Sequence, residues 1–216
     1  IAIINNVEFD HADIFRSVDD IVRSFQQLVR IVPRNGRILV NADDHLSSRL
    51  IEQAPSPVDT VGLDDAATWR MVDVHHKDGW LHWSVVHQTN GTHDLRLQVP
   101  GVHNARNATM AAVAAWYADV TLEESIHALT TFKPPKRRLE HIGVWKGATV
   151  IDDFAHHPTA IRATIQAQLH VTPDRPVHVV FEPRSNTTTR AFFQQELTEC
   201  FEGAATVCIG PVNRPE

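Results

Sequence analysis

The sequence predicts an α/β protein made of two regions, and three observations lead to that prediction. Strand-like and helix-like segments alternate at both ends of the chain, which is typical of sheets with crossover helices. A β meander at about residues 55–99 lies within the first region. Pro134 and Pro135 are followed by three basic residues, which indicates a linker. We therefore expect one domain over residues 1–139 and a second over residues 140–216.

Length and composition exclude several classes of protein. Of the 216 residues, 43% are hydrophobic and 21% are charged, which is typical of a globular protein and not of a disordered one. The formal net charge of −6 disfavours non-specific binding to nucleic acid, which depends on neutralising phosphates. The longest apolar run, Met110–Ala118, has nine residues, whereas a bilayer helix needs about 20, so we expect no membrane partner.

The start of the chain and the cysteines indicate a location. The first residues lack the basic segment of a secretory signal. Cys200 and Cys208 do not form a Cys-x-x-Cys pair, so we expect both to be buried and reduced. The sequence therefore predicts a cytoplasmic protein.

The first region is expected to begin with alternating strands and helices. Apolar residues over Ile14–Val32 recur at three- and four-residue spacing, with Asp13 as the cap and Pro33 as the stop. Around this helix we expect a buried strand at Ile1–Ile4, a strand at 37–40 and a short helix at 45–53. Because a central parallel strand normally follows earlier elements, a strand at the very start suggests a piece of a longer protein.

Turn and cap residues define the elements that follow. Lys77-Asp78-Gly79 and Asn90-Gly91 are turn sequences between expected strands at 68–75, 80–88 and 95–99. An alanine-rich helix is expected at 104–117, and Thr121 with Glu124 forms a capping box for a helix to about residue 131. After the linker the pattern predicts the start of a doubly wound sheet, with strands at 148–151, 177–181 and 206–209 and helices at 158–169 and 190–201.

Polar residues gather where expected strands meet expected helices, the edge at which open α/β sheets bind ligands. The first group, Glu8, Asp10, His11 and Asp13, could surround a divalent cation. In the alternative interpretation, Asp13 only caps the helix and His11 only fills the turn.

The second group begins the alanine-rich helix. Asn104 and Asn107 are three residues apart, so their side chains share one face of the helix. Two carboxamides on one face suit the donor and acceptor edge of a purine. Alternatively, Asn104 is a plain N-cap.

The third group contains two aspartates and two histidines before the helix that starts at Pro158. A helix N-terminus attracts anions, so Asp153 could hold a ribose and His156 or His157 a phosphate. Alternatively, one aspartate caps the helix and the histidines are solvated. After the next strand, Arg184 offers a planar fork for a carboxylate or phosphate, or belongs to an ordinary polar loop.

Six strings in order resemble the motifs of the Mur ligases, a family of bacterial cell-wall synthesis: NNVEFDHADIF, VNADD, GVHNARNATMAA, KRRLE, DDFAHHPTAI and EPRSNT. The resemblance implies that residues 1–139 are the later part of the family's central ATPase domain. Residues from 140 onward would be the first half of its Rossmann-like C-terminal domain. The family's UDP-binding domain and its phosphate loop have no counterpart here, since no G-x-x-x-x-G-K-[ST] string and no G-x-G-x-x-G string occur.

The resemblance also implies ATP and Mg²⁺ as cofactors and assigns residues to them. In the first region, His11 would ligate Mg²⁺, and Asn104 and Asn107 would contact the adenine. Arg138 would meet ATP at the junction of the domains.

In the second region, Asp153 would hold the ribose, with His156 and His157 near the phosphates. Arg184, Ser185 and Asn186 would face the acyl phosphate or the incoming peptide. His156 and Arg184 would be the catalytic residues.

The strings EFDHADIF, DDFAHHPTA and EPRSNT most resemble the peptidoglycan-recycling branch of the family. This implies a ligase that uses ATP to join the tripeptide L-alanyl-γ-D-glutamyl-meso-diaminopimelate to UDP-N-acetylmuramate through an acyl phosphate. The helix at 14–32 contains no lysine, which fits this branch and the one that adds L-alanine. Three alternatives stay open: the L-alanine ligase, a nucleotide-binding fragment without catalysis, and a metal-dependent hydrolase that uses His11, His156 and His157. We expect the fragment alone to be inactive.

Overall fold

A computed structural model describes residues 1–11, 14–183 and 193–211, which form two compact units. The first unit comprises residues 1–9, 14–98 and 103–132. The second comprises the chain from Lys133 onward, with short segments near Asp10 and at Val99–Val102. None of the described helices combines the length and apolar character needed to span a bilayer.

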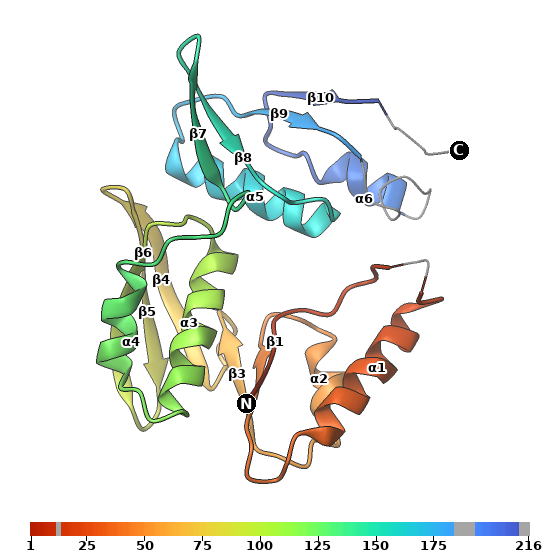
Figure 1. Cartoon of the computed structure of the whole chain (residues 1–216), viewed down its shortest axis with the longest axis vertical. Coiled ribbons are helices and arrows are strands. Elements are labelled where there is room, and N and C mark those ends of the chain that lie inside the picture. Colours follow the sequence, from red (N-terminus) through yellow and green to blue (C-terminus); the bar gives the residue numbers. More distant parts are fainter. Residues whose placement is uncertain (12–13, 184–192, 212–216) are drawn as a thin grey trace. The chain divides into compact units, whose positions relative to one another are not determined.

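The first unit is built around a mixed sheet of six strands in the order β1-β2-β3-β4-β5-β6 (Figure 1). The first four strands run parallel: β1 (Ala2–Ile4), β2 (Ile38–Asn41), β3 (Val58–Gly62) and β4 (Trp69–Lys77). The last two continue antiparallel: β5 (Trp80–His87) and β6 (Gly91–Leu97). Because β1, β2 and β3 are parallel and pair from end to end, their carboxyl ends meet at one edge of the sheet, and β4 begins beside the end of β3.

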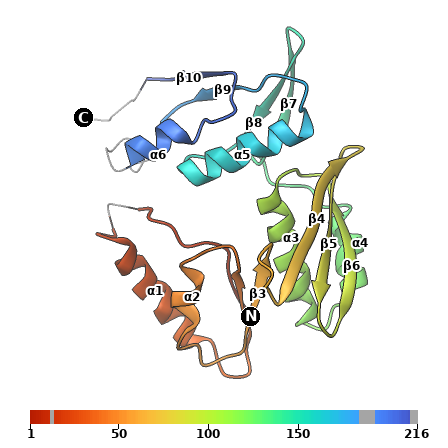
Figure 2. The same cartoon turned by 180° about the vertical axis from the view of Figure 1, so that it is seen from behind.

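Four helices accompany this sheet: α1 (Val18–Ile31), α2 (Ser47–Ile51), α3 (Val102–Trp116) and α4 (Leu122–Leu129). The two views show α1 and α2 beside the parallel strands, and α3 and α4 beside β4–β6 (Figures 1 and 2). The α1 side chains Ile21, Val22 and Val29 are buried in one cluster with Ile38 and Val40 of β2. The apolar stripe seen in the sequence is therefore the face that covers the sheet.

The predicted start of α1 at Ile14 is wrong. Ile14 is 69% exposed, and the helix begins at Val18. Ser17 has extended backbone dihedrals and its side chain accepts a hydrogen bond from the Asp20 amide, which is the geometry of an N-cap. The predicted cap, Asp13, lies outside the described residues.

The antiparallel meander and the capping box are confirmed. Asp78 and Gly79 both have positive φ angles, 51° and 80°, as a two-residue type I′ hairpin turn requires. The Trp83 indole Nε1 of β5 donates to Thr109 Oγ1 of α3 at 2.9 Å, inside the core. Thr121 and Glu124 cap α4 reciprocally.

Two expectations about the first sheet are corrected. Ile1 and Ile3 are 55% and 44% exposed, because β1 lies at the end of the described strand order and is covered on one face. β3 is not predicted from the sequence, since Pro55 and Pro57 stand directly before it. Because β3 pairs with both β2 and β4, the meander belongs to the same sheet as the parallel strands.

Tyr117, which follows α3, connects segments that are far apart in the chain. Its hydroxyl donates to the Asp59 carboxylate of β3, which is 7% exposed. Arg37, just before β2, lies 3.5 Å from Asp59 Oδ1, and its guanidinium carbon lies 4.2 Å from the centre of the tyrosine ring. Burial, and then the neighbouring carboxylate, raise the pKa of Tyr117 to about 12.

The second unit contains two small sheets. β7 (Glu140–Trp145) and β8 (Ala148–Asp152) pair antiparallel, and β9 (His178–Phe181) and β10 (Thr206–Ile209) pair parallel. α5 (Pro158–Val171) joins β8 to β9, and α6 (Gln194–Glu199) lies between β9 and β10 in the chain. Ile161 and Ile165 of α5 form the core with Phe181 and Cys200.

The α/β fold class is confirmed, with two corrections in this unit. β7 is not predicted from the sequence, and β8 pairs with it, whereas the pattern led us to expect one series of three parallel strands. Cys200 is buried as expected, and burial raises the pKa of its thiol. Cys208, expected to be buried, is exposed on β10.

Candidate functional site

Two aspartates follow β2 at the carboxyl edge of the parallel strands. Asp44 accepts hydrogen bonds from the Val7 amide at 3.0 Å, from the Ser47 hydroxyl at 3.0 Å and from the Leu46 amide at 3.1 Å. Val7 lies in the loop after β1, so this one carboxylate joins that loop to the loop after β2. A carboxylate that accepts several N–H groups fixes the backbone around it.

Asp43 makes a longer-range connection. Its Oδ1 accepts from the Leu63 and Asp64 amides after β3, at 2.8 and 3.0 Å, and its Oδ2 pairs with the Arg106 guanidinium of α3. The Arg106 and Asp43 side chains are only 17% and 24% exposed. This ion pair therefore joins the ends of β2 and β3 to the first turns of α3.

Gly62, the last residue of β3, allows this arrangement. A Cβ atom at this position would lie 2.7 Å from Asp43 Oδ1 and 2.9 Å from the Ala42 Cβ. Real Cβ atoms do not approach other heavy atoms that closely, so the carboxylate crosses the end of β3 only because no side chain is present there.

The candidate adenine-binding residues lie on the helix that Arg106 anchors. Asn104 is half-buried and Asn107 is exposed, and both belong to the first turns of α3. Ala105, which lies between them, and Ala108, which follows Asn107, are buried. The structure thus places both carboxamides on one element whose first turns are fixed to two strand ends, which suits recognition of a planar base by donor and acceptor groups.

In the second unit, Asp153 is engaged by its own surroundings. Its Oδ2 accepts from the Leu139 amide at 2.8 Å, and its Oδ1 accepts from the Ala155 amide at 2.8 Å and the Thr164 hydroxyl at 3.2 Å. Two carboxylate oxygens offer about four acceptor sites. Hydrogen bonds from the described residues use three of these sites, which leaves about one for a ligand hydroxyl.

Arg138 and His156 both lie beside the ring of Phe154, the residue that follows Asp153 in the chain. The Arg138 guanidinium carbon lies 5.7 Å from the centre of the Phe154 ring, and the His156 ring centre lies 5.0 Å from it. His156 Nδ1 lies 3.0 Å from the Phe154 carbonyl oxygen, which can only accept, so Nδ1 carries the proton and Nε2 is left as the acceptor. His157 is the N-cap of α5 and lies edge-on to Phe193, 5.0 Å between ring centres.

The remaining candidates are His11, Arg184, Ser185 and Asn186. His11 is exposed with φ at 55°, and its backbone amide donates to Asp10 Oδ1 at 2.7 Å. Arg184, Ser185 and Asn186 lie outside the described residues. In the described ranges, no group of three histidine, cysteine, aspartate or glutamate side chains is placed to hold a metal ion, so the three-histidine hydrolase site is not formed there. Mg²⁺ usually binds one or two carboxylates together with phosphate oxygens and water, so His11 as a ligand stays a prediction.

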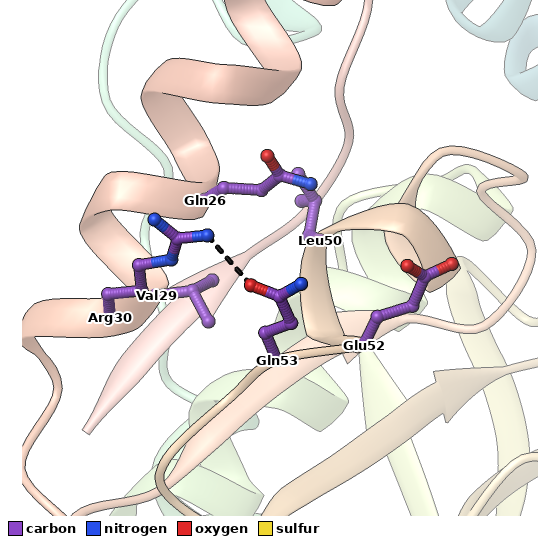
Figure 3. A pocket seen from close by; sticks show the side chains of 6 residues that line it. All are labelled: Gln26, Val29, Arg30, Leu50, Glu52 and Gln53. Atoms are coloured by element: carbon purple, nitrogen blue, oxygen red, sulfur yellow. Dashed lines mark hydrogen bonds between the residues drawn. The ribbon is translucent and has the colours of Figure 1, made fainter.

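A surface pocket lies elsewhere in the first unit, between α1 and α2 (Figure 3). Arg30 donates to Gln53 Oε1 at 2.7 Å across it. Among the described residues, none of the predicted site residues lines this pocket.

Asp43, Asp44 and Arg106 are the residues that sequence reasoning did not assign to the site. The string VNADD marks the two aspartates, but on its own it only indicates a turn. Asp43 and Arg106 are 63 positions apart, so no local spacing connects them. The signal that could have identified them is position: acidic residues directly after a buried parallel strand lie at the ligand-binding edge.

Comparison with known proteins finds two domain models that match along the chain. A family model described as "Mur ligase middle domain" matches residues 1–115. A second, described as "Mur ligase, glutamate ligase domain", matches residues 137–215.

Individual relatives agree with these matches. A UDP-N-acetylmuramate–L-alanine ligase of Desulfitobacterium hafniense is 34% identical over 97% of this chain and 46% of its own length. The crystal structure of a murein peptide ligase from Psychrobacter arcticus aligns with 30% identity and a TM-score of 0.65, covering 96% of this chain and 42% of that one. The UDP-N-acetylmuramate–alanine ligase of Thermotoga maritima, at 23% identity and a TM-score of 0.75, covers 98% of this chain and 45% of its own and shows likeness of fold. The chain thus spans about half the length of the relatives it matches.

Proposed function

This chain belongs to the Mur ligase family, and from that premise we propose that the whole protein is an ATP-dependent amide ligase. A carboxylate of UDP-N-acetylmuramate takes the terminal phosphoryl group of ATP to give an acyl phosphate and ADP. The amine of a peptide then attacks the acyl carbon and releases phosphate, forming the amide. The observation that carries this proposal is that both domain models match in order along one chain.

The first unit is proposed to hold the base of ATP. Asn104 and Asn107 supply donors and acceptors for the adenine edge, and the Asp43–Arg106 pair keeps their helix in place. A preorganised site loses less conformational entropy on binding than a loose one. In this proposal Asp43 and Arg106 act through α3 and do not touch the nucleotide.

The second unit is proposed to act on the ribose and phosphates. The free acceptor capacity of Asp153 suits a ribose hydroxyl, and the Nε2 of His156 suits a protonated phosphate or a water near it. Arg138 contributes a positive charge beside them, and His157 contributes a second imidazole. His11 is the proposed ligand of Mg²⁺, which would neutralise phosphate charge when bound. Arg184, Ser185 and Asn186 are proposed to meet the acyl phosphate or the peptide. The reaction is assigned to the cytoplasm.

We assign the tripeptide L-alanyl-γ-D-glutamyl-meso-diaminopimelate as the amine. Three motif strings support the recycling branch, and the murein peptide ligase of P. arcticus is 30% identical over 96% of the chain. The alternative amine is L-alanine, and a specific observation favours it: relatives from Desulfitobacterium, Clostridium and Caldanaerobacter, 30–34% identical, are named UDP-N-acetylmuramate–L-alanine ligases.

The two amines are distinguished by direct competition. The whole protein is given ATP, Mg²⁺ and UDP-N-acetylmuramate with equal concentrations of L-alanine and tripeptide, and products are separated by mass. We expect the tripeptide adduct to form with the larger kcat/KM. A larger kcat/KM for L-alanine replaces the tripeptide assignment with the sister activity.

A nucleotide-binding protein without catalysis is the remaining alternative. Calorimetric titration of ATP with Mg²⁺ into the 216-residue chain, followed by an assay for ADP release with both substrates, separates the cases. Binding without release by the whole protein would contradict the ligase proposal. The fragment itself is expected not to turn over.

A further inference from the structure

Two histidines face each other on the solvent side of the antiparallel meander, away from the edge described above. His75 of β4 and His82 of β5 are direct partners in the antiparallel register. Their ring centres lie 5.5 Å apart and the planes differ by 15°. Directly opposite residues in such a pair have neighbouring Cβ atoms, so both rings project from the same face of the sheet.

A β-bulge creates this pairing. Val72 pairs with Ser84 and His75 pairs with His82, so three steps along β4 correspond to two along β5. Without the extra residue, Val74 would stand opposite His82. Asp73, inside the bulge, has a φ of 53°, a conformation that non-glycine residues adopt only when the surroundings impose it.

The same bulge fixes the ring of His75. The Asp73 carbonyl oxygen lies 2.7 Å from His75 Nδ1, and a carbonyl can only accept, so Nδ1 carries the proton. Nε2 is then left with an unshared electron pair in the neutral ring. Histidines that bind metals typically donate their other ring N–H to a backbone carbonyl or a carboxylate in this way.

The surroundings leave this pair accessible. His75 is exposed and His82 is half-buried. Arg96 is the register partner of His82 on β6, but its guanidinium carbon lies over the Trp80 ring, 4.8 Å from its centre. Asp94 is engaged with the Ser84 hydroxyl at 2.6 Å.

We propose that His75 and His82 form a two-histidine site for a divalent transition metal such as Zn²⁺, Ni²⁺ or Cu²⁺, with water in the remaining positions. Imidazole nitrogen is a preferred ligand of these ions. Zinc–nitrogen bonds of about 2.0–2.1 Å bring two ligating nitrogens to about 3.4 Å of each other. The ring centres now lie 5.5 Å apart, and in this proposal the His82 side chain rotates to bring its ligating nitrogen to that distance from Nε2 of the fixed His75 ring. The site is distinct from the proposed ATP and Mg²⁺ positions and does not depend on the ligase activity.

The tautomer is tested first, in the metal-free chain at a pH where the rings are neutral. Two-dimensional NMR of the imidazole nitrogens distinguishes a proton on Nδ1 from one on Nε2. We expect His75 in the Nδ1–H form, the less common form of free histidine. A proton on Nε2 would overturn the proposal, because that nitrogen is the metal ligand.

Zn²⁺ alone is then titrated into the wild-type chain and into the variants His75→Ala, His82→Ala and His82→Gln. In the wild type we expect the NMR signals of both imidazole rings to shift together as Zn²⁺ is added. Each variant should bind Zn²⁺ at this position more weakly by at least about 10- to 100-fold, the loss typical when only an outer-shell partner of a ligand is removed. His170→Ala is the matched control, since His170 is exposed and its Nδ1 also lies close to a carbonyl, that of Gln166 at 2.6 Å. Its affinity should equal that of the wild type.

The variants change exposed or half-buried side chains, and circular dichroism reports whether each one folds. His82→Gln keeps a polar side chain of similar size, so it serves if the alanine variant unfolds. Equal Zn²⁺ affinity in the wild type and a folded His82 variant would overturn the proposal. NMR signals that shift at His75 but not at His82 when Zn²⁺ is added would also overturn the proposal.

Discussion

In the first unit, candidate site residues are held by contacts between segments far apart in the chain, whereas in the second they are held within one loop and its neighbours. Asp43 connects the ends of β2 and β3 to α3, whose residue Arg106 is 63 positions away. Asp153 accepts from residues no more than 14 positions away. The same chemical group thus organises a sheet edge in one unit and a loop in the other.

This difference predicts where mutations will act. An ion pair or hydrogen bond between distant segments breaks only when the packing around it is also lost. Removing it by mutation should therefore lower the stability of the whole unit. A hydrogen bond within a loop can open locally. Removing it should therefore affect ligand binding and local amide hydrogen exchange more than global unfolding. The predictions below test that contrast, from the largest effect to the smallest.

Asp43→Ala is expected to give the largest loss of stability. The change leaves the largely buried Arg106 guanidinium without its carboxylate and two amides without their acceptor, so unfolding should require about 3 kcal/mol less free energy. Denaturant unfolding measures this. The matched control is Asp65→Ala, whose pair with Arg70 has its carboxylate 87% exposed. A loss no greater than that of the control would contradict the proposed anchor.

Tyr117→Phe should lower the free energy of unfolding by a small amount at every pH, and it should also remove a pH dependence that the wild type shows at alkaline pH. The folded-state pKa of about 12 lies above the unfolded value of about 10, so the folded state retains the proton more strongly. The stabilisation from the protonated Tyr117 is complete below about pH 10 and declines by up to about 2 kcal/mol as the pH rises toward 12. The phenylalanine variant should lack this decline.

The chain contains one tyrosine, so the ultraviolet absorbance of tyrosinate reports this group alone. A midpoint near 10 in the folded protein would show that the bond to Asp59 does not hold the proton. Asp59→Asn provides a second check, since it removes the charge and should lower the midpoint.

Asp153→Ala should act more locally. It removes the acceptor of the Leu139 and Ala155 amides, so their hydrogen exchange should accelerate, with about 1–2 kcal/mol lost from the second unit. In the whole protein, the apparent KM for ATP should rise. Thr164→Val is the control, because it removes one of the three bonds and leaves the carboxylate. Unchanged KM for ATP would remove Asp153 from the nucleotide site.

Thr121→Ala should have the smallest effect, since its tie lies within a single helical turn. Loss of the N-cap should cost about 1 kcal/mol. Thr131→Ala, near the other end of the same helix, removes only a hydroxyl bond to the Ala128 carbonyl and should cost a few tenths of that. Equal effects would mean that the cap does not start α4.

Patterns within one element were readable from the sequence. The apolar stripe of α1, the Asp-Gly turn, the capping box and the proline at the start of α5 all depend on residues a few positions apart. The α/β class followed from their alternation. The resemblance to the Mur ligases came from strings of the same local kind.

What the sequence did not predict depends on pairing between segments. β3 was hidden by two prolines, and it is a strand because β2 and β4 supply partners on both sides. β7 is exposed and carries no alternating apolar pattern, and it is a strand because β8 follows two residues later. Asp43 and Arg106 meet only after the sheet has formed, so neither residue carries a local signal.

Gly62 has a consequence for how relatives of this chain can vary. A side chain there would occupy the space that the Asp43 carboxylate crosses, so the two positions are coupled by exclusion of volume. Homologues with an acidic residue at the position of Asp43 should therefore have glycine at the position of Gly62. Alanine or serine at the position of Gly62 should occur only in homologues in which both Asp43 and Arg106 have been replaced.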